Sequence, residues 1–174
     1  DTQRAALDHV ERPAFYDRSE SLVLVAVTVR NLELVEPLFA GESKSATLLY
    51  VLDQTLTGMG GRLLRRRLLR PSMDQAEIEA RLDAVEEMAK GAILRGEVAK
   101  LLGTILDLER LLAKTTIGNA TPRDLLALGK SLAVIPQVRA KIAGCGARRL
   151  QEIAAGLDDV AEARDAILNG LSAE

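Results

Sequence analysis

The chain has 174 residues, of which 48% are hydrophobic and 28% are charged, so its composition is that of a globular domain and excludes a disordered segment. The formal net charge of -2 argues against a domain whose whole surface holds nucleic acid, so any such role must be local. The single cysteine excludes an internal disulfide framework and suits a reducing, cytoplasmic compartment, and no run of about 18 apolar residues is present to span a membrane.

The first part of the chain carries mixed signals. Residues 1–20 are polar and indicate a linker or tail, whereas residues 22–27 are rich in β-branched side chains and predict a short strand. Pro37 ends the segment that follows, and residues 39–46 have the composition of a loop. From Thr47 the pattern is helical almost to the end, and a core of Leu, Ile, Val and Ala suits packed helices.

Two neighbouring helices are marked by their ends. Thr57 caps an arginine-rich helix that Pro71 stops. Two capping boxes then compete for the start of the next helix, one at Ser72 and one at Asp74, and Gly91 ends that helix. The apolar residues of this second helix recur at the spacing of a core-facing stripe, and they are Ile78, Leu82, Val85 and Met88.

Further helix signals continue toward the C-terminus. Thr104 is the expected cap of a helix that has Asp107 in its first turn. Thr121 is a second cap, with Pro122 at the first helical position. A glycine–cysteine–glycine break and two amphipathic stretches complete the chain. The sequence therefore predicts an all-α, multi-helix bundle over residues 21–174, with at most one short strand near the N-terminus.

The arginine-rich helix has two kinds of arginine. At about 100° per residue, Arg62, Arg65 and Arg66 cluster on the face opposite the leucines. Most such charge runs only solvate a helix, but these three are the candidates to face a nucleic acid, without an interleaved aromatic side chain to stack on bases. Arg67 falls inside the apolar stripe, where we expect its methylenes to follow the apolar surface while its guanidinium reaches water.

The sequence offers no catalytic, cofactor-binding or metal-binding constellation. The Gly-Lys-Ser triplet at 129–131 lacks the earlier glycine and the strand–loop–helix context of a phosphate-binding loop. His9 and Cys145 are each alone of their kind, whereas metal sites need three or four ligands and nucleophile triads need a base. The adjacent carboxylates at 86–87 and 158–159 point about 100° apart on a helix, which suits a solvated surface.

Four blocks of sequence carry a resemblance. They are RNLEL (30–34), TLLYVLDQTLTGMGGRLLRRRLLRP (47–71), DLERLL (107–112) and TPRDLLAL (121–128). In order and spacing, residues 22–136 resemble the core, or lever, domain of the MutS family of DNA mismatch-repair proteins. Two positions depart from the family pattern. Arg67 stands where the family usually has Trp, in agreement with an apolar-face position, and Val25 stands where it usually has a capping Asp, so the first helix starts less firmly.

The resemblance implies a role without chemistry of its own. MutS-like proteins are homodimeric, intracellular clamps that find mismatched duplex DNA and use ATP and Mg. By this resemblance, residues 1–20 join a preceding connector domain, and residues 21–174 form the helical core (lever) domain, truncated before the clamp. The mismatch reader, the clamp and the ATPase lie outside the chain. The fragment is therefore expected to have no enzyme activity and no cofactor, and to relay nucleotide state between the ATPase and the clamp.

Two other classes of protein remain open. A stand-alone helical protein-interaction module would present a partner-sized apolar patch. A small DNA-binding helical protein that uses the Arg62–Arg70 helix would bind duplex DNA with a steep dependence on salt.

Glycines 58, 60 and 61 lie at the start of the arginine-rich helix. Because glycine lacks a β-carbon, we expect this entry to be a packing contact that a neighbouring backbone approaches closely. Replacing Gly60 with Val is then expected to lower the melting temperature.

Overall fold

The computed structural model describes residues 21–171, and the tail or linker predicted for residues 1–20 lies outside the described residues. Residues 21–171 fold into helices and loops without a strand, which confirms the all-α prediction. None of the helices in this range has both the length and the apolar character that a membrane crossing needs.

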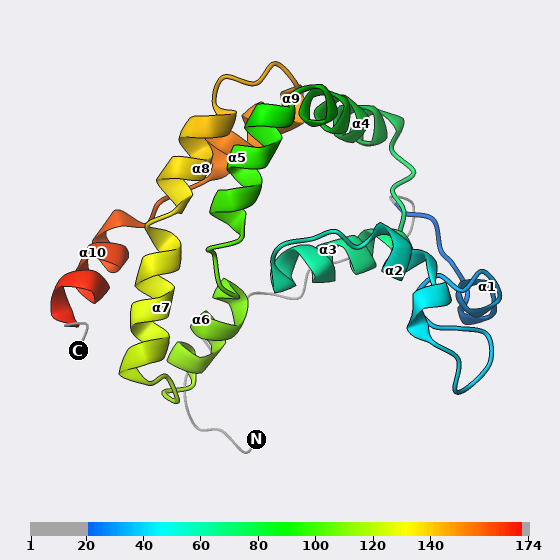
Figure 1. The fold of residues 1–174 in the computed structure, drawn as a ribbon, viewed down its shortest axis with the longest axis horizontal. Helices are drawn as coiled ribbons and strands as arrows, with labels where there is room; N and C mark the ends of the chain where they lie inside the picture. Colours follow the sequence, from blue (N-terminus) through cyan, green and yellow to red (C-terminus); the bar gives the residue numbers. More distant parts are fainter. Residues whose placement is uncertain (1–20, 172–174) are drawn as a thin grey trace.

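The helices form an arch (Figure 1). One end consists of α1 (Ala26–Asn31), the 3-10 turn η1 (Lys44–Ala46), α2 (Leu48–Leu52) and α3 (Gly58–Leu69). The top consists of α4 (Gln75–Lys90), α5 (Ala92–Leu102), α8 (Ile135–Ile142) and α9 (Arg148–Gly156). The other end consists of α6 (Leu108–Thr116), α7 (Pro122–Leu132) and α10 (Ala161–Gly170).

The short strand expected at residues 22–27 is absent. Ser21 forms an isolated antiparallel bridge with Ser72, and residues 22–25 have no regular secondary structure before α1 begins at Ala26. One bridge gives an extended segment no sheet to join, so its β-branched side chains do not produce a strand. Val25 occupies the N-cap of α1 without a side-chain cap hydrogen bond, so the stabilisation that a capping Asp would give is missing there.

A hydrophobic core joins the four helices at the top of the arch. Its buried members are Ala84, Val98, Ile142, Cys145, Leu150 and Ala154. Direct packing of α4 on α9, of α5 on α8 and of α8 on α9 encloses this cluster. Removing aliphatic surface from water is the main stabilising contribution in such a core, at about 25 cal/mol per Å².

Helix α4 presents to this core the face opposite to the predicted one. Ala80 and Ala84 are buried, whereas Leu82 and Val85 are 61% and 65% exposed. At about 100° per residue these two pairs lie on opposite sides of the helix. The small alanine side chains let α9 approach closely, so the apolar stripe is left facing outward. The prediction of a core-facing stripe is therefore wrong for Ile78, Leu82 and Val85, which are all exposed, and is confirmed only for Met88, which packs against the core.

The end formed by α6, α7 and α10 depends on a small residue and a buried hydroxyl group. Gly129 of α7 lies against α10, where an added β-carbon would come within 2.8 Å of Ile167 Cγ2. Ser131 is 1% exposed, and its hydroxyl donates to the Ala127 carbonyl at 2.8 Å and accepts from the Leu106 N–H at 3.1 Å. The hydroxyl thus joins α7 to the loop that precedes α6.

Helix starts mostly follow local capping rules. Thr57 caps α3 and Thr121 caps α7, as predicted. Helix α6 differs, because Asp107 is its N-cap. The predicted cap, Thr104, instead donates its hydroxyl to the Leu101 carbonyl at 2.7 Å, just beyond the end of α5. Thr104 and Asp107 can both accept a capping hydrogen bond, and Asp107, which directly precedes the helix, forms the cap.

Candidate functional site

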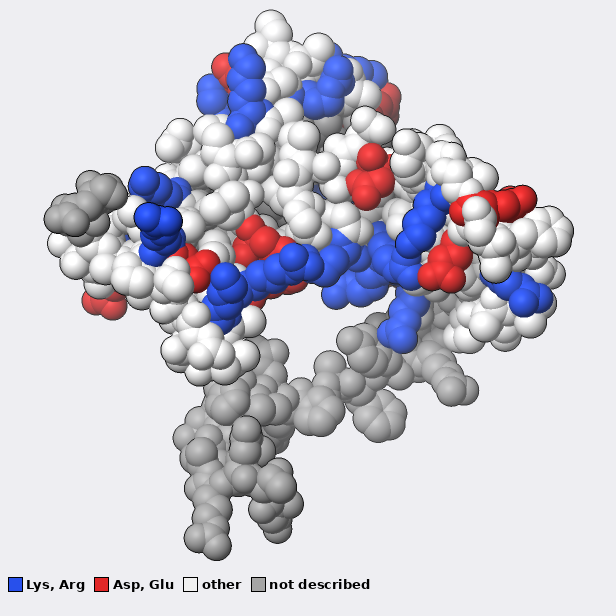
Figure 2. All heavy atoms as spheres, turned by 60° about the horizontal axis from the view of Figure 1, so that its bottom comes forward, with Lys and Arg blue, Asp and Glu red and all other residues white. Residues whose placement is uncertain are grey.

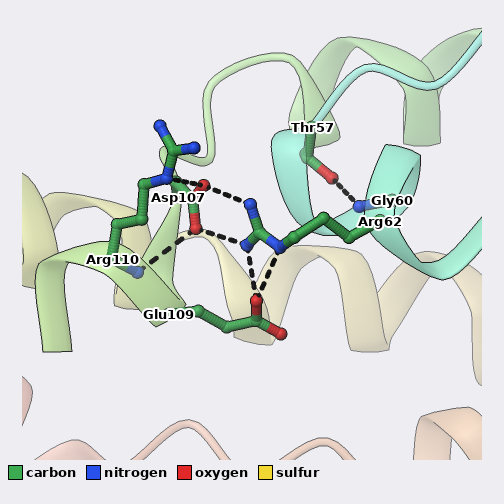
Figure 3. Close-up of polar contacts among 6 residues, drawn as sticks. All are labelled: Thr57, Gly60, Arg62, Asp107, Glu109 and Arg110. Carbon is green, nitrogen blue, oxygen red and sulfur yellow. Dashed lines mark hydrogen bonds and ion pairs between the residues drawn. The ribbon is translucent and has the colours of Figure 1, made fainter. Parts of the chain in front are cut away.

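One arginine of α3 joins the two ends of the arch (Figure 3). Arg62 donates from Nη1 and Nη2 to the two carboxylate oxygens of Asp107, both at 2.8 Å, and from Nε to Glu109 Oε2 at 2.9 Å. These carboxylates lie 45 and 47 residues further along the chain. We call Arg62, Asp107 and Glu109 the arginine clasp. Because bidentate guanidinium–carboxylate contacts are directional, the clasp fixes an orientation as well as a distance.

The clasp carboxylate of Asp107 also starts helix α6. It accepts from the Arg110 N–H at 3.3 Å as the N-cap, and its side chain is 21% exposed. The Arg62 guanidinium holds the pKa of Asp107 at about 2, and the carboxylates in turn raise the pKa of Arg62. Both groups therefore stay charged near neutral pH. Since the Arg62 side chain is 42% exposed, solvent screens the attraction, and the contribution of the clasp lies mainly in alignment.

The other two candidate residues, Arg65 and Arg66, are exposed on α3. Within residues 21–171 neither side chain forms a hydrogen bond or an ion pair. Together with Arg62 and Leu69 they line a shallow cavity of about 270 Å³. Figure 2 shows a band of Lys and Arg side chains across the face that carries α3. The sequence thus placed Arg65 and Arg66 correctly on an open surface, whereas Arg62 is already bound to carboxylates.

Arg67 lies at the edge of the apolar face. The residue is exposed as a whole, which agrees with the predicted path of its side chain to the surface. The guanidinium is still partly desolvated, and this desolvation, followed by repulsion from Arg81 and Arg149, lowers its pKa. The arrangement fits a methylene stem that follows the apolar surface and a head that reaches water.

Chemistry-bearing groups do not gather elsewhere in the described part of the chain. Residues 21–171 contain no group of three His, Cys, Asp or Glu that could hold a metal ion. The triplet at 129–131 lies inside α7, where the backbone N–H groups are used by the helix, so these residues do not fit a nucleotide phosphate. Cys145 is buried, and this burial raises the pKa of its thiol, opposite to what an activated nucleophile requires.

Most of the chain matches one known protein family. The sequence model of MutS domain III matches residues 27–173. The chain belongs to the MutS domain III family.

Similar proteins carry the name "DNA mismatch repair protein MutS". The one from Solibacter usitatus is 58% identical over 178 residues, which covers 100% of this chain and 20% of that protein. The one from Pelotomaculum thermopropionicum is 44% identical over 95% of this chain and 19% of that protein. The one from Methanothrix thermoacetophila is 40% identical over 91% of this chain and 18% of that protein. The chain therefore spans about a fifth of the length of these relatives.

This MutS domain III contains a second ionic contact that the sequence did not indicate. Arg149 of α9 donates to Glu77 of α4, and at 3.0 Å to Glu152. Arg81 donates to the same Glu77 carboxylate at 2.7 Å, and these bonds lower the pKa of Glu77, with that from Arg149 as the largest cause. The Nε of Arg149 is buried and has no hydrogen-bond partner among the described residues. The contact joins α4 to α9 beside the core of the domain.

The adjacent carboxylates of this MutS domain III have separate roles. Glu86 is exposed and pairs with Lys90 one turn away, as expected of a solvated surface. Glu87 instead accepts the N–H groups of Gly146 and Ala147 at 2.8 and 2.7 Å, and these bonds lower its pKa. Glu87 therefore holds the loop between α8 and α9 against α4. Nothing local in the sequence distinguishes it from its neighbour.

Proposed function

We propose that the chain is the core domain of a MutS-like mismatch-recognition protein and relays nucleotide state between an ATPase and a DNA clamp that lie elsewhere in the polypeptide. Membership of the MutS domain III family supports this role, as does the name of the relatives, which are about five times longer. The partners in this proposal are the remaining MutS domains, a second subunit of the full-length protein and mismatched duplex DNA.

The observation that carries the relay role is the arginine clasp. It connects α3 with the start of α6, so a displacement of one end of the arch acts directly on the other. The core between α4, α5, α8 and α9 lies between these ends and is closely packed, and close-packed interiors transmit displacement because they do not compress. A relay needs this combination of a stiff body and a directional contact.

The relay involves no chemistry within the chain. ATP and Mg would be held by the ATPase part of the full-length protein and supply its hydrolysis reaction there. The side chains of this chain would act by position alone, with the guanidinium of Arg62 held in line by the carboxylates of Asp107 and Glu109. The absence of enzyme activity in the isolated chain stays a prediction, to be checked by a nucleotide hydrolysis assay.

The proposal is tested in a complete protein. The matching segment of the Solibacter usitatus relative, 58% identical over this chain, is replaced by the present sequence, and Arg62→Gln is introduced. Mismatch binding without nucleotide and basal ATP hydrolysis are expected to stay within about twofold of the parent. The acceleration of DNA release by ATP is expected to fall by about fivefold or more, the lower range of coupling between two binding sites.

Arg123→Gln is the matched control, because Arg123 is exposed on α7 and its side chain forms no hydrogen bond or ion pair among the described residues. If ATP accelerates DNA release equally in the parent, in Arg62→Gln and in Arg123→Gln, the clasp takes no part in the relay and the proposal is refuted.

A further inference from the structure

A groove runs between α1 and α3, beside the arginine clasp. Its cavity volume is about 590 Å³, and its apolar lining includes Leu24, Val29 and Leu69. Arg30 of α1, Arg65 of α3 and Arg70, which follows α3, line the same groove together with one carboxylate, that of Glu36. Arg65 and Leu69 also line the smaller cavity along α3, so the groove continues into the exposed arginine surface.

The composition of the groove restricts what it can hold. An apolar lining favours a ligand with apolar side chains, because their burial is worth about 25 cal/mol per Å². The arginines favour carboxylates or phosphates, which accept charge-assisted hydrogen bonds from guanidinium groups. A nucleic-acid backbone would satisfy Arg65 but would leave Leu24 and Val29 against a charged, hydrated surface. No aromatic side chain lines the groove to stack on a base.

Within the molecule itself, the arginine clasp shows that the arginine surface of α3 binds carboxylates. Arg62, next to Arg65 on the same face of α3, is bound by Asp107 and Glu109, two carboxylates spaced two residues apart. These carboxylates also place negative charge at one end of the arginine surface. This charge disfavours the approach of a polyanion such as DNA. The groove resembles the clasp because Arg30 and Arg65 offer guanidinium groups to carboxylates, with only Glu36 as an acidic residue in the lining, and it adds an apolar lining.

We propose that the groove between α1 and α3 docks an acidic, leucine-bearing polypeptide segment from another part of the same MutS-like polypeptide. The source follows from length, since the relatives extend to about five times this chain. It also follows from the large apolar side chains exposed on and beside α1, among them Val25, Val27 and Leu32. A segment that buries its leucines on this surface and pairs its carboxylates with Arg30 and Arg65 complements both features. This inference rests on the proposed function, because it assumes the rest of a MutS-like polypeptide.

The first experiment compares hydrogen exchange in the 174-residue chain with exchange in the full-length Solibacter usitatus chimera. The amides of α1 are expected to exchange at least tenfold more slowly in the chimera, and Arg65→Glu is expected to abolish most of that protection. Arg123→Glu serves as the control, because it reverses an exposed charge on α7, away from the groove. Circular dichroism melting verifies that each variant stays folded. Equal exchange in the chain and the chimera, or protection that survives Arg65→Glu, would overturn the proposal.

The second experiment identifies the chemistry with defined probes. A labelled synthetic helix with leucines at helical spacing flanked by glutamates is added to the 174-residue chain, and its binding is followed by fluorescence anisotropy. Binding at least tenfold tighter than that of the same helix with glutamines, and at least tenfold weaker in Arg65→Glu, is the expected result. No difference between the two helices would count against an acidic occupant.

Two further outcomes would replace the proposed occupant. Displacement of the helix by a 20-base-pair duplex would point to nucleic acid. Concentration-dependent association of the chain alone, removed by Arg65→Glu in sedimentation, would point to a second copy. Neither result changes the outcome of the ATP-coupling assay with Arg62→Gln, so failure of this inference is distinguishable from failure of the relay.

Discussion

Packing between α7 and α10 can be tested at a single atom. Gly129 lies where an added β-carbon would meet Ile167 Cγ2 at 2.8 Å and Leu168 Cδ2 at 3.1 Å. The first of these atoms belongs to a β-branched side chain that is stiff at χ1, so it cannot simply rotate away. We therefore expect Gly129→Ala to displace α10 from its packed position against α7.

The size of the effect follows from two opposing contributions. Overpacking a close contact costs about 1–3 kcal/mol. Replacing glycine by alanine inside a helix gains about 1 kcal/mol. Gly96 provides the matched control, because it lies within α5 and has nothing within 4 Å of its would-be β-carbon. Gly96→Ala should therefore stabilise the chain by about 1 kcal/mol, and the difference between the two variants isolates the clash at about 1–3 kcal/mol.

The assay is urea unfolding followed by circular dichroism at 222 nm. Combining Gly129→Ala with Ile167→Ala removes the Cγ2 atom and should make the glycine substitution less costly than it is in the parent chain. If Gly129→Ala and Gly96→Ala shift the unfolding midpoint upward by the same amount, the close approach of α10 to α7 is refuted.

Three further predictions concern polar and backbone contacts. Ser131→Ala leaves the Leu106 N–H without its acceptor and should destabilise the chain by about 1–3 kcal/mol in the same urea assay; an unchanged midpoint would contradict this role. The ion pair with Lys114 is the largest cause that lowers the pKa of Asp124 to about 2. This pKa lies below about 3.9, the value in the unfolded chain, so the stabilisation by the ion pair is complete above about pH 3.9 and is lost as the pH falls toward 2. Asp124→Asn should therefore flatten the dependence of the unfolding midpoint on pH between about pH 2 and 3.9. The close neighbours of Gly60 are side-chain atoms of Thr55 and Thr57 and not the backbone that was expected. Gly60→Val should still lower the melting temperature, because its β-carbon would come within 3.1 Å of the hydroxyl that caps α3, and a melt equal to that of the parent would refute it.

Local physics made much of the fold predictable. Thr57 and Thr121 act as caps whatever the rest of the chain does, because a cap needs only the first turn of its own helix. Gly91 ends α4 for a similarly local reason. Residues 22–27 were predicted as a strand because β-branched side chains favour extended backbone, but a strand also needs a partner that the local sequence does not encode.

Contacts between distant segments were not predictable. The pattern of α4 correctly gave an apolar stripe, but periodicity does not say whether a neighbour meets that stripe or the opposite face. The partners of Arg62 lie 45 and 47 residues away, and Asp107 and Glu109 resemble any other exposed acids at a helix start. Arg65 was placed correctly as exposed, because a charged side chain on the helix face opposite the leucines stays in water when no partner is offered to it.

The inverted face of α4 has a consequence for how this helix tolerates mutation. Its bulkiest aliphatic side chain, Leu82, contributes little to the interior, so a charged replacement there leaves the folded chain almost unaffected. Ala84, one of its smallest, has no room for growth, because it is buried in the cluster that α5 and α9 share. A library of α4 variants selected for folding of this chain alone would accept charge at the leucine and reject bulk at the alanine, the reverse of what hydropathy predicts.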